Sequence, residues 1–110
     1  MKRASANLLA VVTTAFVLVL ALPLHAQDPA TTYKSKCAGC HGAEGKADTV
    51  PGKALGAHDF ASREVTKMSD AELINIIADG KNKMPAYGKS LKEAEIKDLV
   101  AFIRDLSKKK

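Results

Sequence analysis

The five residues from Cys37 to His41 have the types and spacing that attach a metal cofactor to a chain. They read Cys37-Ala38-Gly39-Cys40-His41, a C-x-x-C-H motif typical of c-type haem attachment. On a helical turn both thiols and the imidazole share one face. The motif therefore predicts one haem c, held by thioethers from Cys37 and Cys40, with its iron bound by His41.

Other roles for this cysteine pair are less well supported. A thioredoxin-like redox motif requires a βαβ context, which does not follow here. A zinc site needs more ligands, and the only other histidines are His25 and His58. A disulfide between Cys37 and Cys40 would close a loop too short to restrict the unfolded chain much. Haem attachment is the preferred interpretation.

A second candidate ligand, Met84, lies in an irregular segment among charged residues. Packing explains such a methionine poorly, whereas its soft sulfur suits the sixth position of an iron opposite His41. Pro85 follows it and stiffens the loop, because proline moves the preceding residue away from helical geometry. Met68 and His58 are rival ligands, and Met84 is preferred for its turn context.

The first 26 residues have the pattern of a secretory signal. Lys2-Arg3 precedes an uncharged stretch over residues 8–22, and a small residue stands before a predicted cut at Gln27. We expect a cleaved signal peptide, residues 1–26, and export to the periplasm or otherwise out of the cytoplasm. A retained membrane anchor is the alternative, although the stretch is short against the roughly 20 residues of a membrane span.

The remaining residues, 27–110, are expected to form one small domain. Removal of the signal lowers the basic count from 17 to 15 against 12 acidic residues, which leaves a net charge of +3. This mild balance, with no aromatic interleaving, gives nucleic-acid binding little support. A chain of this size forms a modest core, so a large cofactor would supply apolar area that its side chains lack.

Start and stop signals predict three helices in this domain. They run from Asp28-Pro29 towards Cys40, from the capping box of Ser69 and Glu72 to a left-handed Gly80, and from Ser90 with a second capping box to Glu93. Between the first two helices, residues 42–67 lose periodicity and are rich in glycine. We expect a loop wrapped around a haem edge there, with one short helical turn near residues 62–67.

The last helix has an apolar stripe and a charged remainder. The stripe follows i, i+3, i+4, i+7 spacing through Ile96, Leu99, Val100, Ile103 and Leu106. The charged side chains are expected to face solvent; they are Lys92, Lys97, Asp98, Arg104 and Asp105. This helix should cross the first one and bring Phe102 or its neighbours towards Tyr33, which is expected to face the core. In the 42–67 loop, Lys53, His58 and Arg63 either reach a haem propionate or lie on the surface.

These residues together resemble the small single-haem class I cytochromes c of bacteria. The resemblance rests on Tyr33 before the C-x-x-C-H motif, on Gly80-Lys81-Asn82-Lys83-Met84-Pro85 with Tyr87, and on Leu99-Val100-Ala101-Phe102-Ile103-Arg104. It implies an all-α fold whose crossed N- and C-terminal helices enclose one covalently attached haem. It maps Cys37 and Cys40 onto the thioether cysteines, His41 onto the proximal ligand and Met84 onto the distal ligand.

The function expected from this resemblance is one-electron transfer, without enzymatic activity, by iron cycling between Fe(II) and Fe(III). Two filled axial positions would keep substrates from the metal, and methionine raises the potential. Redox proteins would serve as donor and acceptor, docking on a basic rim, unless the lysines are merely scattered; these are Lys34, Lys36, Lys46, Lys81, Lys83 and Lys89. The alternatives are a haem peroxidase or gas sensor with an open distal site, and an electron-relay subunit of a larger oxidoreductase.

Overall fold

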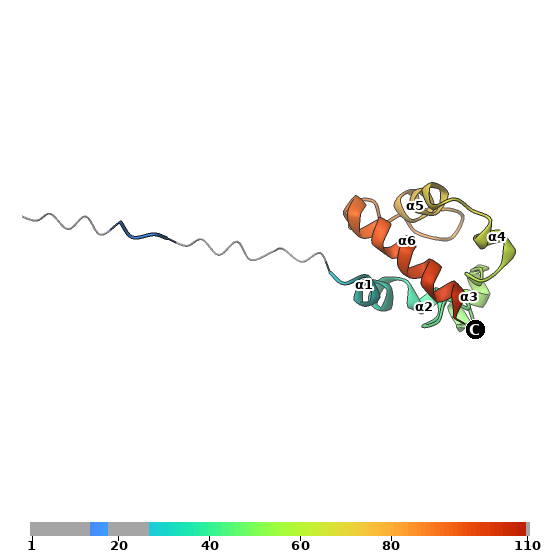
Figure 1. Ribbon diagram of the computed structural model, residues 1–110. Coiled ribbons are helices and arrows are strands. Elements are labelled where there is room, and N and C mark those ends of the chain that lie inside the picture. Colours follow the sequence, from blue (N-terminus) through green and yellow to red (C-terminus); the bar gives the residue numbers. More distant parts are fainter. Residues whose placement is uncertain (1–13, 18–26, 110) are drawn as a thin grey trace, which may run out of the picture.

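The computed structural model describes residues 14–17 and 27–109. Within them the fold is all-α, as predicted, and no strand occurs. The helices are α1 (Pro29–Lys36), α2 (Ala38–His41), α3 (Val50–Leu55), α4 (Arg63–Thr66), α5 (Asp70–Asp79) and α6 (Glu93–Lys108) (Figure 1). Of the predicted signal peptide, residues 14–17 are irregular and exposed, and the rest lies outside the described residues. No helix in the described part of the chain is long and apolar enough to span a membrane.

The predicted first helix is divided at Cys37. It begins at Pro29, whose missing N–H is harmless in the first turn, and it ends where the Cys37 N–H donates to the Tyr33 carbonyl. Cys37 has φ −117°, outside helical values, and α2 starts again at Ala38. The prediction of one continuous helix towards Cys40 was therefore right at its start and wrong at Cys37.

Residues 42–67, predicted as a loop because of their glycine content, contain the helix α3. The Thr49 hydroxyl accepts a hydrogen bond from the Gly52 N–H at 3.0 Å, and Pro51 occupies the first turn of α3. Gly56 ends α3 in the left-handed conformation, at φ 72° and ψ 32°. The short turn predicted near residues 62–67 is confirmed as α4.

Both boundaries of α5 follow its sequence signals, with one difference in backbone geometry. The Ser69 hydroxyl accepts from the Glu72 N–H, and the Glu72 carboxylate accepts from the Ser69 N–H, which confirms the capping box. Gly80 ends the helix with φ 76° and ψ 166°, so its φ is positive as predicted but its ψ lies outside the left-handed helical region. Glycine is required here, because a Cβ would lie 2.7 Å from the Met84 carbonyl oxygen.

The last helix starts later than predicted. The N–H groups of Ser90 and Leu91 both donate to the Tyr87 carbonyl, so Ser90 lies in a turn that precedes α6. The first helical residue is Glu93, and the Glu95 carboxylate accepts from the Lys92 N–H at 2.7 Å. The predicted capping box of Ser90 with Glu93 is therefore wrong, and the helix begins two residues later. The reason is that Ser90 belongs to the turn that follows Tyr87.

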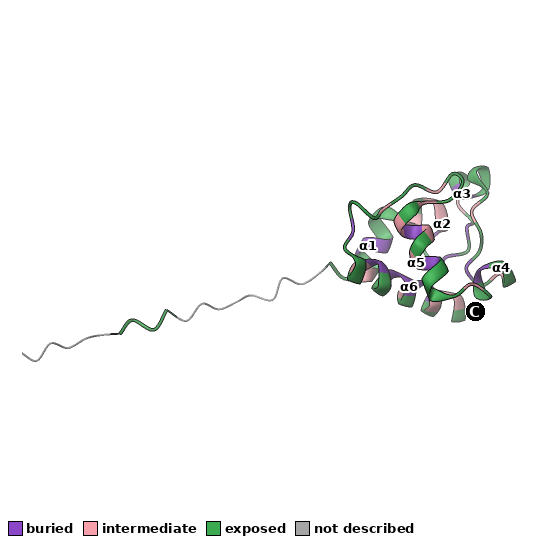
Figure 2. Ribbon diagram, turned by 90° about the horizontal axis from the view of Figure 1, so that it is seen from above, coloured by how far each residue is buried: buried purple, intermediate pink, exposed green. Residues whose placement is uncertain are grey.

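The core lies where α6 meets α1 and α5 (Figures 1 and 2). All five residues of the predicted apolar stripe of α6 are buried, and Figure 2 shows the buried parts of these helices on their inner sides. Tyr33 is 2% exposed, and its ring centroid lies 5.2 Å from that of Phe102. The contact between the N- and C-terminal helices is thus confirmed and includes the predicted aromatic pair.

Arg104 departs from the prediction that the charged residues of α6 only face solvent. Its guanidinium donates to the carbonyls of Met68 and Val65 and to the Asp70 carboxylate, 3.0 Å away. The Arg104 side chain is 25% exposed, whereas that of Asp70 is 71% exposed. Arg104 therefore fastens α6 to the segment between α4 and α5 mainly through backbone carbonyls.

We expect Arg104→Ala to lower the free energy of unfolding by about 1–3 kcal/mol, because charged hydrogen bonds to partly buried carbonyls are lost. Thermal unfolding monitored by circular dichroism measures the change. Asp70→Asn is the control, since removal of an exposed ion pair costs no more than about 1 kcal/mol. An Asp70→Asn effect as large as that of Arg104→Ala would show that the ion pair, and not the carbonyls, is the important contact.

Candidate functional site

The four predicted site residues line one cavity of about 570 Å³. Cys37, Cys40 and His41 contribute one wall, and Met84 belongs to the segment that follows α5. Much of the remaining wall is apolar, through Phe60, Val65, Leu73, Ile76, Ile77, Leu99 and Ile103. Cofactor pockets typically enclose ~300–1,000 Å³ behind apolar walls with few polar groups. The cavity is therefore suited to a large, mostly apolar cofactor.

Backbone hydrogen bonds hold the C-x-x-C-H turn from both sides. The His41 N–H donates to the Cys37 carbonyl at 2.9 Å, and the Ala47 N–H donates to the His41 carbonyl at 2.8 Å. The Thr49 hydroxyl donates to the Cys40 carbonyl at 2.8 Å, which ties this turn to the start of α3. Loss of this side-chain contact would free the Cys40 carbonyl at the cavity wall.

The two cysteines are half-buried and are not joined by a disulfide. Burial raises the pKa of the Cys37 thiol, against a smaller lowering effect of Lys36. A redox-active C-x-x-C motif works instead through a thiol whose pKa is lowered. The environment of Cys37 therefore does not favour the thioredoxin-like alternative.

His41 presents a neutral imidazole to the cavity. Burial lowers the pKa of His41, and the nearby His58 lowers it further. Its Nδ1 is buried and has no hydrogen-bond partner among the described residues. An unprotonated ring nitrogen is what binding to a metal requires.

A tight turn positions Met84. The Met84 N–H donates to the Lys81 carbonyl at 2.9 Å, and the Lys81 N–H donates back to the Met84 carbonyl at 3.2 Å. Asn82 turns the chain with φ 52°, a conformation that asparagine tolerates better than most residues. Further along, the Gly88 N–H donates to the Ala78 carbonyl of α5. The thioether is thus carried on a short segment anchored at both ends.

Tyr87 joins the two sides of the cavity. Its hydroxyl donates to the carbonyl of Lys36 at 3.2 Å, which links the Met84 segment to the residue just before Cys37. Its own N–H donates to the Ile77 carbonyl of α5 at 2.9 Å. Nothing in the sequence pattern predicted this link, because the two partners are 51 residues apart.

We expect Tyr87→Phe to lower the free energy of unfolding by about 0.5–1.5 kcal/mol, because one hydrogen bond is lost while the ring remains. Thermal unfolding measures the loss. Tyr33→Phe is the comparison, because its buried hydroxyl donates to the Gly42 carbonyl at 2.6 Å and should contribute more. A larger loss in Tyr87→Phe than in Tyr33→Phe would contradict this order.

The two rival ligands line the same cavity as Met84. Met68 is half-buried against the core, as Met84 is, so packing does not distinguish the methionines. His58 is exposed, and its Nδ1 lies 3.0 Å from a Glu64 carboxylate oxygen. Only Met84 sits in an anchored turn followed by proline. Of the basic residues considered for a propionate, His58 lines the cavity, whereas Lys53 and Arg63 do not.

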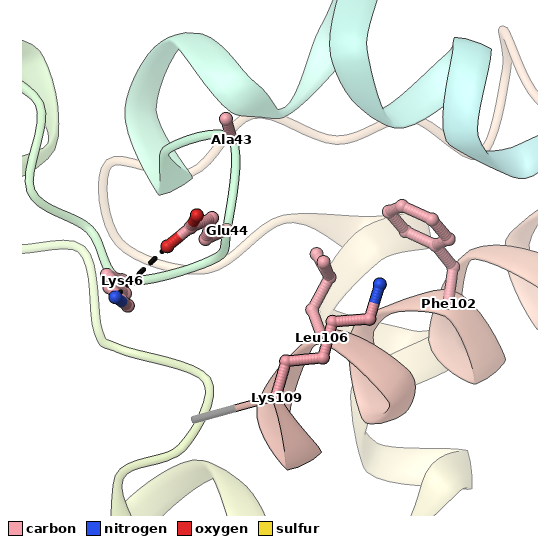
Figure 3. A pocket seen from close by; sticks show the side chains of 6 residues that line it. All are labelled: Ala43, Glu44, Lys46, Phe102, Leu106 and Lys109. Carbon is pink, nitrogen blue, oxygen red and sulfur yellow. Dashed lines mark ion pairs between the residues drawn. The ribbon is translucent and has the colours of Figure 1, made fainter.

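The lysines predicted to form a rim are divided among different surfaces. Lys36, Lys81 and Lys83 line the cavity, whereas Lys34 and Lys89 do not. Lys46 lies 3.0 Å from the Glu44 carboxylate, beside a second pocket of about 640 Å³ (Figure 3). Phe102, Leu106 and Lys109 line the facing side of that pocket. None of the four predicted site residues lines this second pocket.

The residues present fit a covalently attached haem. The imidazole of His41, whose pKa burial lowers, two unpaired thiols and a soft thioether line one largely apolar cavity of suitable volume. Cys37 and Cys40 would hold the macrocycle, and His41 and Met84 would supply nitrogen and sulfur donors, which suit haem iron. Within the described residues, no group of three or more His, Cys, Asp or Glu side chains is placed to hold a metal ion by itself.

Comparison with known proteins agrees with this chemistry. Residues 25–103 match the family model described as cytochrome C oxidase, cbb3-type, subunit III. The chain belongs to this cytochrome c family. The family is one of electron carriers, and the pair Cys37 and Cys40 is consistent with its C-x-x-C-H haem attachment.

Individual relatives agree with this assignment. This cytochrome c family member is 33% identical to cytochrome c6 of Rippkaea orientalis, over 88% of this chain and 87% of that protein. It is 32% identical to subunit CcoP of a cbb3-type cytochrome c oxidase from Azospirillum brasilense, over 69% of this chain but only 26% of that protein. The solved KustC0563 c-type cytochrome matches with a TM-score of 0.66 and 34% identity, over 72% of this chain and 96% of that one.

The motifs missed two residues that shape the site, Phe60 and Thr49. Phe60 stacks on His41 from a segment without periodicity, so no helical pattern marked it. Thr49 joins α2 to α3, and its capping position before Val50-Pro51 was the signal that could have revealed it.

Proposed function

We propose that this cytochrome c family member is an exported electron carrier and not an enzyme. In this proposal Cys37 and Cys40 would attach one haem c, and His41 and Met84 would ligate its iron, which would supply one-electron chemistry between Fe(II) and Fe(III). The observation that carries the proposal is that these four residues line one apolar cavity. Methionine ligation raises the potential and leaves no iron position for a substrate.

The chain's own residues bind, orient and shield. The C-x-x-C-H turn fixes two attachment points and one nitrogen donor, while the anchored Met84 turn supplies the sulfur. Buried apolar side chains of α5 and α6, such as Leu73 and Leu99, would shield a bound haem from water. This low-dielectric enclosure limits solvent reorganisation when the charge of the site changes.

Protein partners would dock at the mouth of this cavity. Lys36, Lys81 and Lys83 are exposed there and would attract acidic partners, with association slowing as salt rises. Of the lysines predicted to form a basic rim, these three are the ones that line the cavity. Residues 1–26 would direct the chain out of the cytoplasm, to the periplasm or beyond.

A redox titration of the haem-loaded protein tests the proposal. We expect one reversible one-electron step, no ready binding of carbon monoxide to the reduced protein, and one haem that stays attached on denaturation. Cys37→Ser with Cys40→Ser should abolish the covalent attachment seen by mass spectrometry. Ready carbon monoxide binding by the wild type would instead favour a peroxidase or gas sensor with an open distal site.

A second candidate is an electron-relay subunit of a larger oxidoreductase, which the match to CcoP favours. The two candidates differ in how tightly the partner is held. A carrier forms small, transient interfaces, whereas a subunit stays bound through a large one. Isolation of the native protein in a stable membrane complex would favour the subunit, and recovery as a free protein would favour the carrier.

A further inference from the structure

Phe60 makes a direct contact with the proposed proximal ligand. Its ring centroid lies 4.8 Å from that of His41, and the two rings are stacked at an interplanar angle of 28°. Phe60 is only 7% exposed and also lines the cavity. One face of the His41 imidazole is therefore covered by a flat, buried surface.

Phe60 is itself held firmly. Its N–H donates to the Gly45 carbonyl at 2.9 Å, and a side chain at Gly45 would collide with the Phe60 ring. On another side the Tyr33 ring lies at 6.2 Å, edge-on at 65°. An aromatic pair with this geometry contributes specific attraction beyond the burial of its area. The orientation of the Phe60 ring is thus set by α1 and by the turn after α2.

The usual means of orienting a metal-bound histidine is absent in the described part of this chain. Such a histidine almost always donates its second ring N–H to a carboxylate, a carbonyl or water, which fixes the ring plane. The Nδ1 of His41 is buried and has no protein partner among the described residues. Rotation of the imidazole about its Cβ–Cγ bond is therefore limited by packing instead of by a hydrogen bond.

We propose that Phe60 is a positioning residue that fixes the plane of the His41 imidazole by ring stacking. The inference rests on the proposed function, in which His41 binds the haem iron. The stacked Phe60 ring resists rotation of the His41 ring, because rotation would lose the close contact between the two ring faces that lie against each other. The orientation of His41 is then a property of the packing between α1, the 42–49 turn and Phe60.

Proton NMR of the ferric, haem-loaded protein tests this role, since the shifts of the haem methyl groups depend on the plane of the axial imidazole. Phe60→Leu and Phe60→Met keep an apolar side chain and remove the ring. We expect both to change the spread of the methyl shifts, and Phe60→Tyr to keep the wild-type spread. Two substitutions guard against one that fails to fold. Phe102→Leu is the matched control, because Phe102 contacts Tyr33 and not His41.

The outcomes separate this role from simple packing. If Phe60→Leu lowers the melting temperature as Phe102→Leu does and leaves the methyl shifts unchanged, Phe60 only fills space and the inference is overturned. A wild-type spectrum without a histidine-ligated haem would contradict the proposed function as well as this inference. A normal wild-type spectrum with unchanged Phe60 variants would overturn the positioning role alone.

Discussion

Met84→Ala is expected to remove the sulfur ligand and convert a closed iron site into an open one. The ferric protein should lose the weak far-red absorption band of iron bonded to methionine sulfur, and the reduced protein should bind carbon monoxide readily. The reduction potential should fall by about 100 mV or more, because axial ligands tune haem potentials over roughly 0.8 V. Absorption spectroscopy combined with a redox titration measures all of these effects.

Met68→Ala is the matched control for Met84→Ala. Both methionines are half-buried against the core and line the cavity, so both substitutions remove similar apolar contacts. Met68→Ala should reduce stability by about 2–5 kcal/mol at most and leave the absorption band in place. If Met68→Ala abolishes the band and Met84→Ala does not, Met68 is the distal ligand and the preference for Met84 is wrong.

Gly52→Ala is expected to be unusually damaging for so small a change. A Cβ at this position would collide with the carbonyl oxygen of Cys40, which belongs to the C-x-x-C-H turn. Backbone atoms cannot move aside by rotation, so α3 must shift away from α2. We expect a loss of about 1–3 kcal/mol, or a fall in melting temperature on the order of 10 °C, with less haem attached. Thermal unfolding and the haem-to-protein ratio measure these losses.

Gly39→Ala provides the comparison, because Gly39 lies inside the C-x-x-C-H motif that Gly52 approaches. A Cβ at Gly39 meets nothing within 4 Å, and the residue lies in α2. Alanine is favoured over glycine in a helix by about 1 kcal/mol, so this substitution should be neutral or stabilising. Equal damage from Gly39→Ala and Gly52→Ala would indicate that the motif tolerates no added methyl group, and that close approach to Cys40 is not the reason.

Local signals predicted most of the fold, because they act within one turn of chain. The capping box at Ser69 and the apolar stripe of α6 are such signals, and both are confirmed. Errors occurred where several local signals compete. Ser90 can begin a helix or close a turn. Its N–H donates to the Tyr87 carbonyl, so in this structure it closes a turn. Thr49 caps α3 and Pro51 lies in its first turn, but the glycine-rich composition of residues 42–67 led to the prediction of a loop.

The residues that carry the chemistry of the candidate site could be predicted, but the contacts that position them could not. C-x-x-C-H and Met84-Pro85 are contiguous motifs, and their residues line one cavity. Contacts between distant segments leave no such pattern. Three such contacts join separate parts of the chain. They are the stacking of Phe60 on His41 and the hydrogen bonds from Tyr87 to Lys36 and from Arg104 to Met68. Their partners are set by the packing of whole helices, which a single sequence does not reveal.

The pairing of α1 with α6 bears on how the chain folds. Tyr33 and Phe102 come from opposite ends of the described domain, so their contact closes a loop of nearly its whole length. Such closure costs entropy before any contact repays it, and non-local contacts slow folding. Tethering at Cys37 and ligation at Met84 would close a shorter loop that includes α2, α3, α4 and α5. Cofactor attachment should therefore accelerate folding as well as stabilise the product, and the bare chain should fold more slowly.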